Sequence, residues 1–124
     1  MVLAQDYGHG LEKRVQSNLG AKNHALIMPD AKIEDVVNSL TSSAFGATGQ
    51  RCMALSVAIF VGKSNLFIEK VIEKAKTMSI SAGINNPDIS PLISNEQKLK
   101  IIEIIKSTEN QGGKILLDGR NYKN

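Results

Sequence analysis

Short apolar runs alternate with longer amphipathic segments along most of this chain, and this order constrains the fold more than any other feature of the sequence. Residues 55–61 form an apolar run that Gly62 would end. This run lies between two segments, 32–45 and 64–78, whose apolar residues recur at helical spacing. Strands that alternate with helices of ten or more residues are typical of βαβ units. The sequence therefore predicts an α/β fold with a mostly parallel, layered sheet, in which 55–61 is a buried strand.

The first two predicted helices have capping signals at their ends. Asp30 is a candidate N-cap for the helix over 32–45, and Gly46 would end that helix. The helix over 64–78 has Ser64 as its candidate N-cap. Both segments place apolar residues on one face and charged residues on the other, so each helix is expected to cover a sheet.

A third helix is predicted from Ser94 to about residue 108. Ser94 and Gln97 have the spacing of a capping box, and Gly112 would stop the chain from continuing as a helix. The apolar residues of this helix are expected to be buried. They are Leu99, Ile101, Ile102, Ile104 and Ile105.

Three shorter segments have the apolar and β-branched character of strands. These are residues 13–19, 25–28 and 114–118, and a turn-like cluster at 20–23 separates the first two. Residues 81–90 are rich in turn formers and precede a proline. The chain thus supplies strands on both sides of its predicted helices.

The composition is that of a soluble globular domain. The 124 residues are 42% hydrophobic and carry a formal net charge of +3, with Lys and Arg scattered among acidic residues. Two Tyr, three Phe and no Trp are too few for the basic and aromatic surfaces that bind single-stranded nucleic acids. The longest apolar stretch is too short to cross a bilayer. We therefore expect no nucleic-acid partner and no membrane partner.

A single cysteine, Cys52, excludes an internal disulfide framework and is typical of a reducing compartment. The first ten residues lack the features of a secretion signal or a transit peptide. No group of Cys, His, Asp and Glu has the spacing of metal ligands. The sequence predicts no targeting signal in this chain and no metal site.

Cys52 lies in a segment of small residues, 44–56, between a predicted helix and a predicted strand. Small neighbours let backbone and substrate approach closely, and Arg51 places a positive charge beside the thiol. Free cysteines in small domains are nevertheless mostly inert. From the residues alone, both interpretations of Cys52 stay open: a reactive nucleophile and a structural thiol.

Four separated blocks of sequence resemble the aldehyde dehydrogenase superfamily, and within it the CoA-acylating branch that acts on methylmalonate and malonate semialdehydes. The blocks occur in the family's order and spacing. They are KRVQSNLGAKNH at 13–24, MPDA at 28–31, FGATGQRCMAL at 45–55 and ILLDGR at 115–120. Residues 1–12 match poorly. The resemblance implies that 13–124 is a partial aldehyde dehydrogenase domain, formed by the end of the cofactor region and the first part of the catalytic region.

The resemblance implies that Cys52 is the catalytic nucleophile. Its thiolate would attack the aldehyde carbon, NAD would accept the hydride, and a thioester would remain on the enzyme. The backbone N–H of Cys52 would help to hold the oxyanion. Leu19 and Gly20 match the place where the family sets its backbone against the nicotinamide ring, although an ordinary strand-to-turn transition explains these two residues equally well.

Asn18 stands thirty-four positions before Cys52, where hydrolytic members of the superfamily carry a glutamate as general base. An amide cannot take a proton from water. A thiol acceptor with a pKa of about 8.5 supplies thiolate without a dedicated base. The resemblance therefore implies acyl transfer to coenzyme A, giving propionyl-CoA or acetyl-CoA. Without the resemblance, Asn18 is best explained as a polar residue near a strand end.

Arg51 is a candidate substrate-binding residue, because a guanidinium binds carboxylates through two hydrogen bonds and the implied semialdehydes each carry a carboxylate. The alternative is a surface charge or an ordinary ion pair. Together with Asn18 and Cys52, Arg51 completes the set of residues that we expect to contact the substrate.

Members of this family are several times longer than 124 residues, which predicts that the chain is a fragment. The alternative function is then a truncated, inactive chain that acts at most as an interaction module, because the cofactor phosphate loop and several sheet strands would be missing. The resemblance also implies that full-length relatives are homo-oligomeric. It implies a location in the mitochondrial matrix or the cytoplasm.

Overall fold

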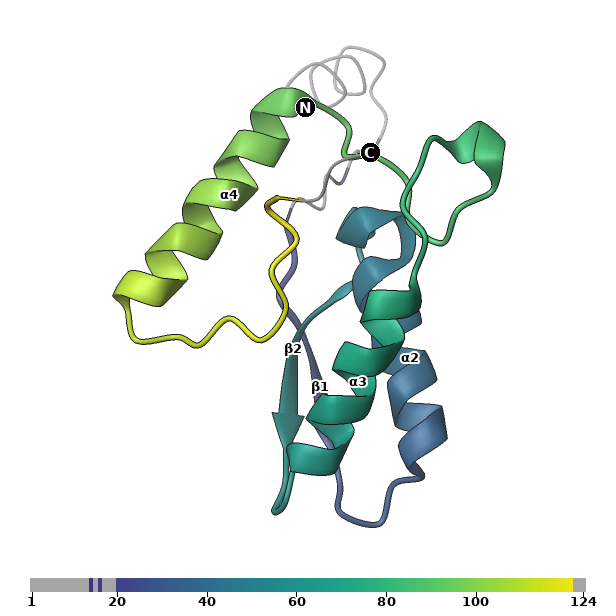
Figure 1. The fold of residues 1–124 in the computed structure, drawn as a ribbon, viewed down its shortest axis with the longest axis vertical. Helices are drawn as coiled ribbons and strands as arrows, with labels where there is room; N and C mark the ends of the chain where they lie inside the picture. Colours follow the sequence, from purple (N-terminus) through teal and green to yellow (C-terminus); the bar gives the residue numbers. More distant parts are fainter. Residues whose placement is uncertain (1–13, 15, 17–19, 122–124) are drawn as a thin grey trace.

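The computed structural model describes residues 14, 16 and 20–121. Within these residues, strands and helices alternate along the chain (Figure 1). The elements are β1 (Asn23–Ile27), α2 (Ile33–Phe45), the 3-10 turn η1 (Gly46–Gly49), β2 (Leu55–Phe60), α3 (Asn65–Thr77), the 3-10 turn η2 (Gly83–Asn85) and α4 (Asn95–Asn110). The predicted order of strand, helix, strand, helix and helix is confirmed for this part of the chain.

The strands β1 and β2 pair in parallel, and α2 is the crossover between them. The pairing runs from Asn23 opposite Leu55 to Ile27 opposite Phe60, with an irregularity directly after Asn23. Parallel neighbours joined by a helix are the βαβ unit that the alternation predicted. The predicted α/β class with a parallel sheet is therefore confirmed.

The core lies between the sheet and the helices α2 and α3, which run side by side on one side of it (Figure 1). Its buried members are Ile27 from β1, Leu40 from α2 and Phe67 from α3. The rings of Phe60 and Phe67 lie 5.9 Å apart, a distance typical of favourable aromatic pairs. Nearby, buried Thr41 donates its hydroxyl hydrogen to the carbonyl of Val37 at 2.8 Å, so its polar atom is satisfied.

The N-caps differ in how well the sequence predicted them. The N-cap of α2 is Lys32 rather than Asp30, because the chain first makes a turn in which Ala31 N–H bonds to the carbonyl of Met28. Ser64 is the N-cap of α3, although its side chain accepts no hydrogen bond there. Ser94 caps α4 as predicted, and its hydroxyl accepts a hydrogen bond from Gln97 N–H at 3.2 Å.

The prediction of a buried strand over 55–61 is only half right. The strand β2 forms, but Val57 and Ile59 are 37% and 47% exposed. Within the described residues the sheet has two strands, so the outer edge of β2 has no neighbour. The predicted strand over 114–118 is wrong. A β-strand needs a neighbouring strand with which to form hydrogen bonds, and residues 114–118 have no such neighbour among the described residues. The predicted strand over 13–19 lies mainly outside the described residues.

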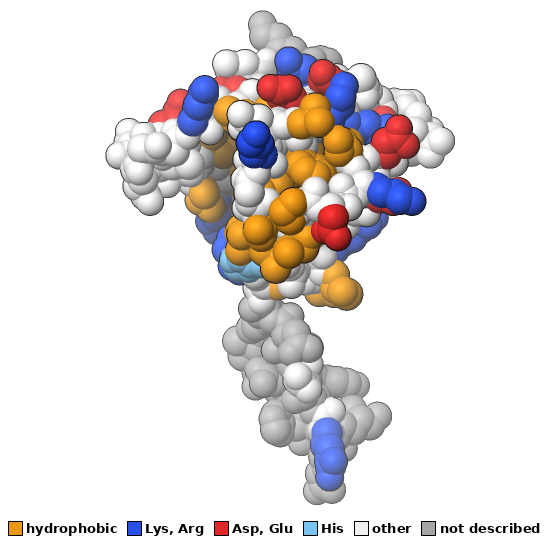
Figure 2. Space-filling view, turned by 90° about the horizontal axis from the view of Figure 1, so that it is seen from below, with side chains coloured by type: hydrophobic (Ala, Val, Ile, Leu, Met, Phe, Trp, Pro, Cys, Tyr) orange, Lys and Arg blue, Asp and Glu red, His pale blue; other side chains and the backbone are white. Residues whose placement is uncertain are grey.

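The prediction that α4 buries its apolar residues is also wrong. Leu99 is 57% exposed and Ile104 is 63% exposed, and α4 stands apart from the layer formed by α2 and α3 (Figure 1). Only Ile102 and Ile105 are half-buried. Figure 2, seen from below, shows further apolar side chains at the surface, ringed by charged ones. Within the described part of the chain, no helix combines the length and the apolar character needed to cross a membrane.

Candidate active site

A cavity of about 650 Å³ lies where the start of β1 meets the loop before β2. It brings together three of the residues that the sequence predicted: Gly20, Arg51 and Cys52. The other residues that line it are Ala21, Lys22, Ala44, Gly49, Gln50, Ala54, Leu55 and Ser56. Asn18 and Leu19, also predicted, lie outside the described residues. The cavity is therefore the place to examine for chemistry.

Cys52 is exposed and lies in a tight turn between η1 and β2. The turn is closed by a hydrogen bond from Ala54 N–H to the carbonyl of Arg51 at 3.1 Å. A second contact comes from Asn23, whose side-chain amide donates to the carbonyl of Cys52 at 2.8 Å and to that of Ala54 at 2.9 Å. An exposed thiol on a well-held turn is accessible to a substrate in the cavity.

Sequence reasoning missed Asn23. The residue is the last of the predicted turn at 20–23 and lies inside the first block of the family resemblance, but its bonding partners are about thirty residues away. The sequence predicted a strand only from residue 25, whereas Asn23 is the first residue of β1. A hydrogen bond from an amide side chain to a distant backbone carbonyl produces no periodic pattern in the sequence, so it could not be predicted from one.

Three consecutive residues before the cysteine turn have left-handed backbone conformations. Ala47, Thr48 and Gly49 have φ angles of 51°, 59° and 71°. Glycine adopts this region freely, whereas each of the other two residues costs about 1 to 2 kcal/mol there. Left-handed non-glycine residues persist only where surrounding contacts hold them, and such residues cluster at functional sites. The segment before Cys52 is therefore a constrained piece of backbone.

Polar side chains of this constrained segment bind the chain after η2. The hydroxyl of Thr48 donates to the carbonyl of Ser90. The side chain of Gln50 donates to the carbonyl of Ala47 at 3.0 Å and accepts from Ile93 N–H at 2.9 Å. The bonds to Ser90 and Ile93 join the cysteine loop to residues more than forty positions later. Together with the bond to Ala47, they offset the conformational cost of the left-handed backbone.

Arg51 is exposed and its guanidinium lies along the backbone of Gly46. A Cβ atom at Gly46 would stand 2.9 Å from Nη1 of Arg51, so only glycine leaves room for this placement. Among the described residues, Arg51 forms no ion pair with a carboxylate. Its charge is therefore available to an anion in the cavity that it shares with Cys52.

Gly20 contributes open backbone to the same cavity. It has a φ of +74°, and a Cβ atom placed on it would meet nothing within 4 Å. This is the geometry that a flat ring needs to approach the backbone closely. Across the residues that the structure describes, no group of His, Cys, Asp and Glu could hold a metal ion.

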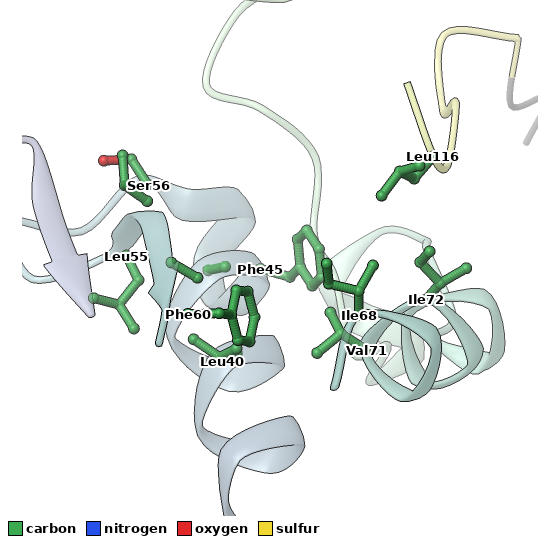
Figure 3. Close-up of a pocket in the computed structure, with 12 residues that line it drawn as sticks. Leu40, Phe45, Leu55, Ser56, Phe60, Ile68, Val71, Ile72 and Leu116 are labelled. Atoms are coloured by element: carbon green, nitrogen blue, oxygen red, sulfur yellow. The ribbon is translucent and has the colours of Figure 1, made fainter. Parts of the chain in front are cut away.

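A second cavity, of about 240 Å³, has a different character (Figure 3). Its walls are almost entirely apolar and come from α2, β2 and α3, with Leu116 on the far side. Phe60, Ile68 and Val71 lie on this cavity, close to the core. Among the described residues that line it, Ser56 is the one polar residue, and none is a residue that the sequence predicted for the site.

The sequence profile of the aldehyde dehydrogenase family matches residues 2–124. The chain is 47% identical over 116 residues to the human mitochondrial methylmalonate-semialdehyde/malonate-semialdehyde dehydrogenase [acylating], and 47% identical over 109 residues to the mitochondrial methylmalonate-semialdehyde dehydrogenase [acylating] of Arabidopsis thaliana. These matches cover 93% and 87% of this chain, but only 21% and 18% of the relatives. The chain thus spans about a fifth of the length of its curated relatives.

Solved structures show the same likeness in three dimensions. A protein of Sinorhizobium meliloti 1021, complexed with NAD and assigned as a methylmalonate-semialdehyde dehydrogenase, superposes with a TM-score of 0.86 at 35% identity over 98% of this chain and 26% of its own. The 1-pyrroline-5-carboxylate dehydrogenase from Thermus, with bound NAD, gives 0.79 at 27% identity over 85% of this chain and 20% of its own. The fold of this chain is therefore shared beyond this sequence.

Proposed function

The chain belongs to the aldehyde dehydrogenase family, and from this membership we propose that it supplies the nucleophile of an NAD-dependent, CoA-acylating dehydrogenase of methylmalonate or malonate semialdehyde. One observation carries the proposal: Cys52 is exposed on an ordered turn and faces a cavity that it shares with Gly20 and Arg51. The names of the relatives support the acylating reaction and the two substrates.

The proposed reaction begins with attack of the Cys52 thiolate on the aldehyde carbon, which forms a carbon–sulfur bond and an oxyanion. The backbone N–H of Cys52 is a donor for that oxyanion. Loss of a hydride from this adduct, for which bound NAD would be the acceptor, leaves a thioester on Cys52. The bond to the carboxyl group of the acyl chain then breaks, carbon dioxide departs, and a proton from solvent takes its place on the enolate carbon. The thiolate of coenzyme A then attacks the thioester carbon, so the acyl group leaves as propionyl-CoA or acetyl-CoA and the Cys52 thiolate is regenerated.

The residues present fit the reacting end of NAD. Gly20 presents open backbone to the cavity that holds Cys52, which is where a nicotinamide ring would have to lie to receive a hydride from the adduct. When bound, NAD supplies the two-electron oxidant. We assign Leu19, beside Gly20, to the same contact.

Arg51 and Asn18 give the proposed site its selectivity. The guanidinium of Arg51, unpaired by any described carboxylate, would bind the substrate carboxylate. With Asn18 in place, no general base would activate water for hydrolysis of the thioester, so the thioester would react with a thiol instead. In this proposal, one residue selects the aldehyde and the other selects the acyl acceptor.

The competing function is an inactive chain that acts only through contacts with other proteins. The uncovered edge of β2 and the exposed apolar residues of α4 favour it, because such surfaces pair with further structure. In the catalytic function, these surfaces would pack against the part of the enzyme that corresponds to the remaining length of the relatives. The names of the relatives support a mitochondrial location, with the cytoplasm as the alternative. We expect the full-length relatives to be homo-oligomeric.

A segment exchange separates the two. The human relative is produced with its matching segment replaced by residues from this chain, and NADH formation is followed with malonate semialdehyde, NAD and CoA. We expect continued turnover, with more than one NADH formed per site, to require both NAD and CoA, and all NADH formation to be lost in Cys52→Ser. The matched control is Ser42→Ala, an exposed hydroxyl change on α2, which should leave the rate unchanged. Full activity in Cys52→Ser would contradict the proposal.

The same exchanged enzyme tests Asn18. We expect Asn18→Glu to allow continued turnover without CoA, with more than one NADH formed per site, because a carboxylate at this position can take a proton from water and so permit hydrolysis of the thioester. Asn18→Gln keeps the amide and serves as the control, with CoA still required. Hydrolysis that stays absent in Asn18→Glu would contradict the role of Asn18.

A further inference from the structure

Asn23 places one side-chain amide between two carbonyls of the cysteine turn. Its Nδ2 atom donates to Cys52 O at 2.8 Å and to Ala54 O at 2.9 Å. Asn23 is the first residue of β1 and pairs with Leu55, the first residue of β2. The amide therefore joins the turn to the start of the parallel sheet.

This contact fixes the backbone on the C-terminal side of Cys52. The carbonyl of Cys52 is held by Asn23, and the carbonyl of Arg51 is held by Ala54 N–H at 3.1 Å. These carbonyls belong to the two planar peptides that flank the Cα atom of Cys52. The orientation of both planes determines where the Cα–Cβ bond points, so the two hydrogen bonds together set the direction of the bond from which the thiol extends.

Other polar side chains near the site act elsewhere. Thr48 and Gln50 bind the chain that follows η2, before the turn begins. Among the residues that the structure describes, Asn23 makes the one side-chain hydrogen bond to the backbone of Cys52 itself. Its role can therefore be separated from the general order of the loop.

We propose that Asn23 is a positioning residue for the Cys52 thiol, acting through the backbone of the turn and not on the substrate. The inference deepens the proposed function, and rests on it for the claim that the thiol is a nucleophile. The hydrogen-bonding arrangement itself, and its test below, do not depend on that claim.

The chemistry of the amide gives this role a signature. Both partners of Nδ2 are acceptors, and an amide nitrogen carries two hydrogens, so one group satisfies both. A carboxylate in the same place would set its lone pairs against two carbonyl oxygens. A protonated carboxyl group would again supply a donor. Asn23→Asp should therefore loosen the turn at neutral pH and regain part of its order in acid.

The test is hydrogen exchange of the Ala54 amide, followed by NMR on the 124-residue chain. In Asn23→Asp near neutral pH, we expect Ala54 N–H to exchange about tenfold faster than in the unaltered chain, because two hydrogen bonds of ordinary strength are lost. The ratio of the two rates should fall towards one below about pH 4, where the introduced carboxyl is protonated. The matched control is Asn38→Asp, the same change at an exposed position of α2, with a ratio near one throughout.

Two further measurements keep the inference testable if Asn23→Asp fails to fold. In the unaltered chain, the side-chain amide protons of Asn23 should exchange more slowly than those of Asn38, and equal rates would overturn the inference. In the segment-exchanged enzyme, Asn23→Ala should lower kcat about tenfold and leave KM within about twofold, because the residue touches no substrate.

The outcomes distinguish this inference from the proposed function. An Ala54 exchange ratio near one at all pH values, or one that is raised equally at neutral and acidic pH, overturns the role of Asn23. An exchanged enzyme that works without the Cys52 sulfur overturns the proposed function and leaves the exchange result intact.

Discussion

The cysteine loop and the layer of α2 and α3 are held by different forces. Around Cys52, hydrogen bonds from Asn23, Thr48 and Gln50 hold a backbone that is partly left-handed and partly exposed, and little apolar surface is buried. In the helical layer, Leu40 and Phe67 are buried among apolar neighbours and carry no chemistry. The difference predicts that stability and the proposed reactivity depend on separate residues, so substitutions should affect one without the other.

The largest expected effect on stability comes from the apolar layer. Phe67→Ala removes a ring that is 7% exposed and packs against Phe60, so we expect a loss of about 3 to 5 kcal/mol in the free energy of unfolding. Denaturant unfolding followed by circular dichroism measures it. Ile104→Ala on α4, where the side chain is 63% exposed, is the control and should cost less than about 1 kcal/mol. Equal losses would break the comparison.

The cysteine loop should show the opposite behaviour. Arg51→Ala leaves the core untouched, so the free energy of unfolding should stay within about 0.5 kcal/mol of its original value. In the segment-exchanged enzyme, the same change should raise KM for malonate semialdehyde about thirtyfold, because a charge-assisted bidentate contact is lost. An uncharged aldehyde of similar size is the control substrate. The idea fails if both substrates are affected alike.

A smaller effect is expected at the start of α4. Ser94→Ala removes the acceptor of the Gln97 N–H bond and should cost about 1 kcal/mol of helix stability. Amide exchange of the first turn of α4 measures it. Ser64→Ala at the start of α3 is a close control, because the Ser64 side chain accepts no hydrogen bond there. A similar loss at both positions would refute the difference between these caps.

The smallest effect concerns the turn formed by Asp118 and Arg120. Hydrogen bonds from the Arg120 guanidinium lower the pKa of Asp118 to about 2. The pKa is lower in the folded chain than in the unfolded one, so this contact stabilises the turn fully at pH values above the ordinary aspartate pKa of about 3.9. The stabilisation is lost as the pH falls towards about 2. NMR titration of the Asp118 carboxyl should show this midpoint. A midpoint near the ordinary value would contradict the contact.

The sequence predicted most of the fold where local signals and packing agree. The periodicity of α2 and α3, and the capping box at Ser94, identified three helices correctly, since each signal lies within the element that it describes. Burial of β2 and α4 was wrong because it depends on partners outside these elements. The local sequence does not show whether such partners exist. Residues 114–118 therefore have the composition of a strand but pair with no other strand among the described residues.

The candidate site divides in the same way. The cysteine segment was recognisable because small residues, an arginine and a thiol are adjacent in sequence. Asn23 was not, because its contacts with Cys52 and Ala54 depend on the register of two parallel strands. Residue types thus revealed where a reaction could occur, and only the folded chain revealed what holds the reacting group in place.

The most direct test of the central claim is the intact mass of the segment-exchanged enzyme after reaction with malonate semialdehyde and NAD in the absence of CoA. We expect one acyl group on Cys52, found by peptide mapping, and its removal when CoA is added. NADH formation with Cys52 unmodified, or an acyl group that CoA does not remove, would contradict the account.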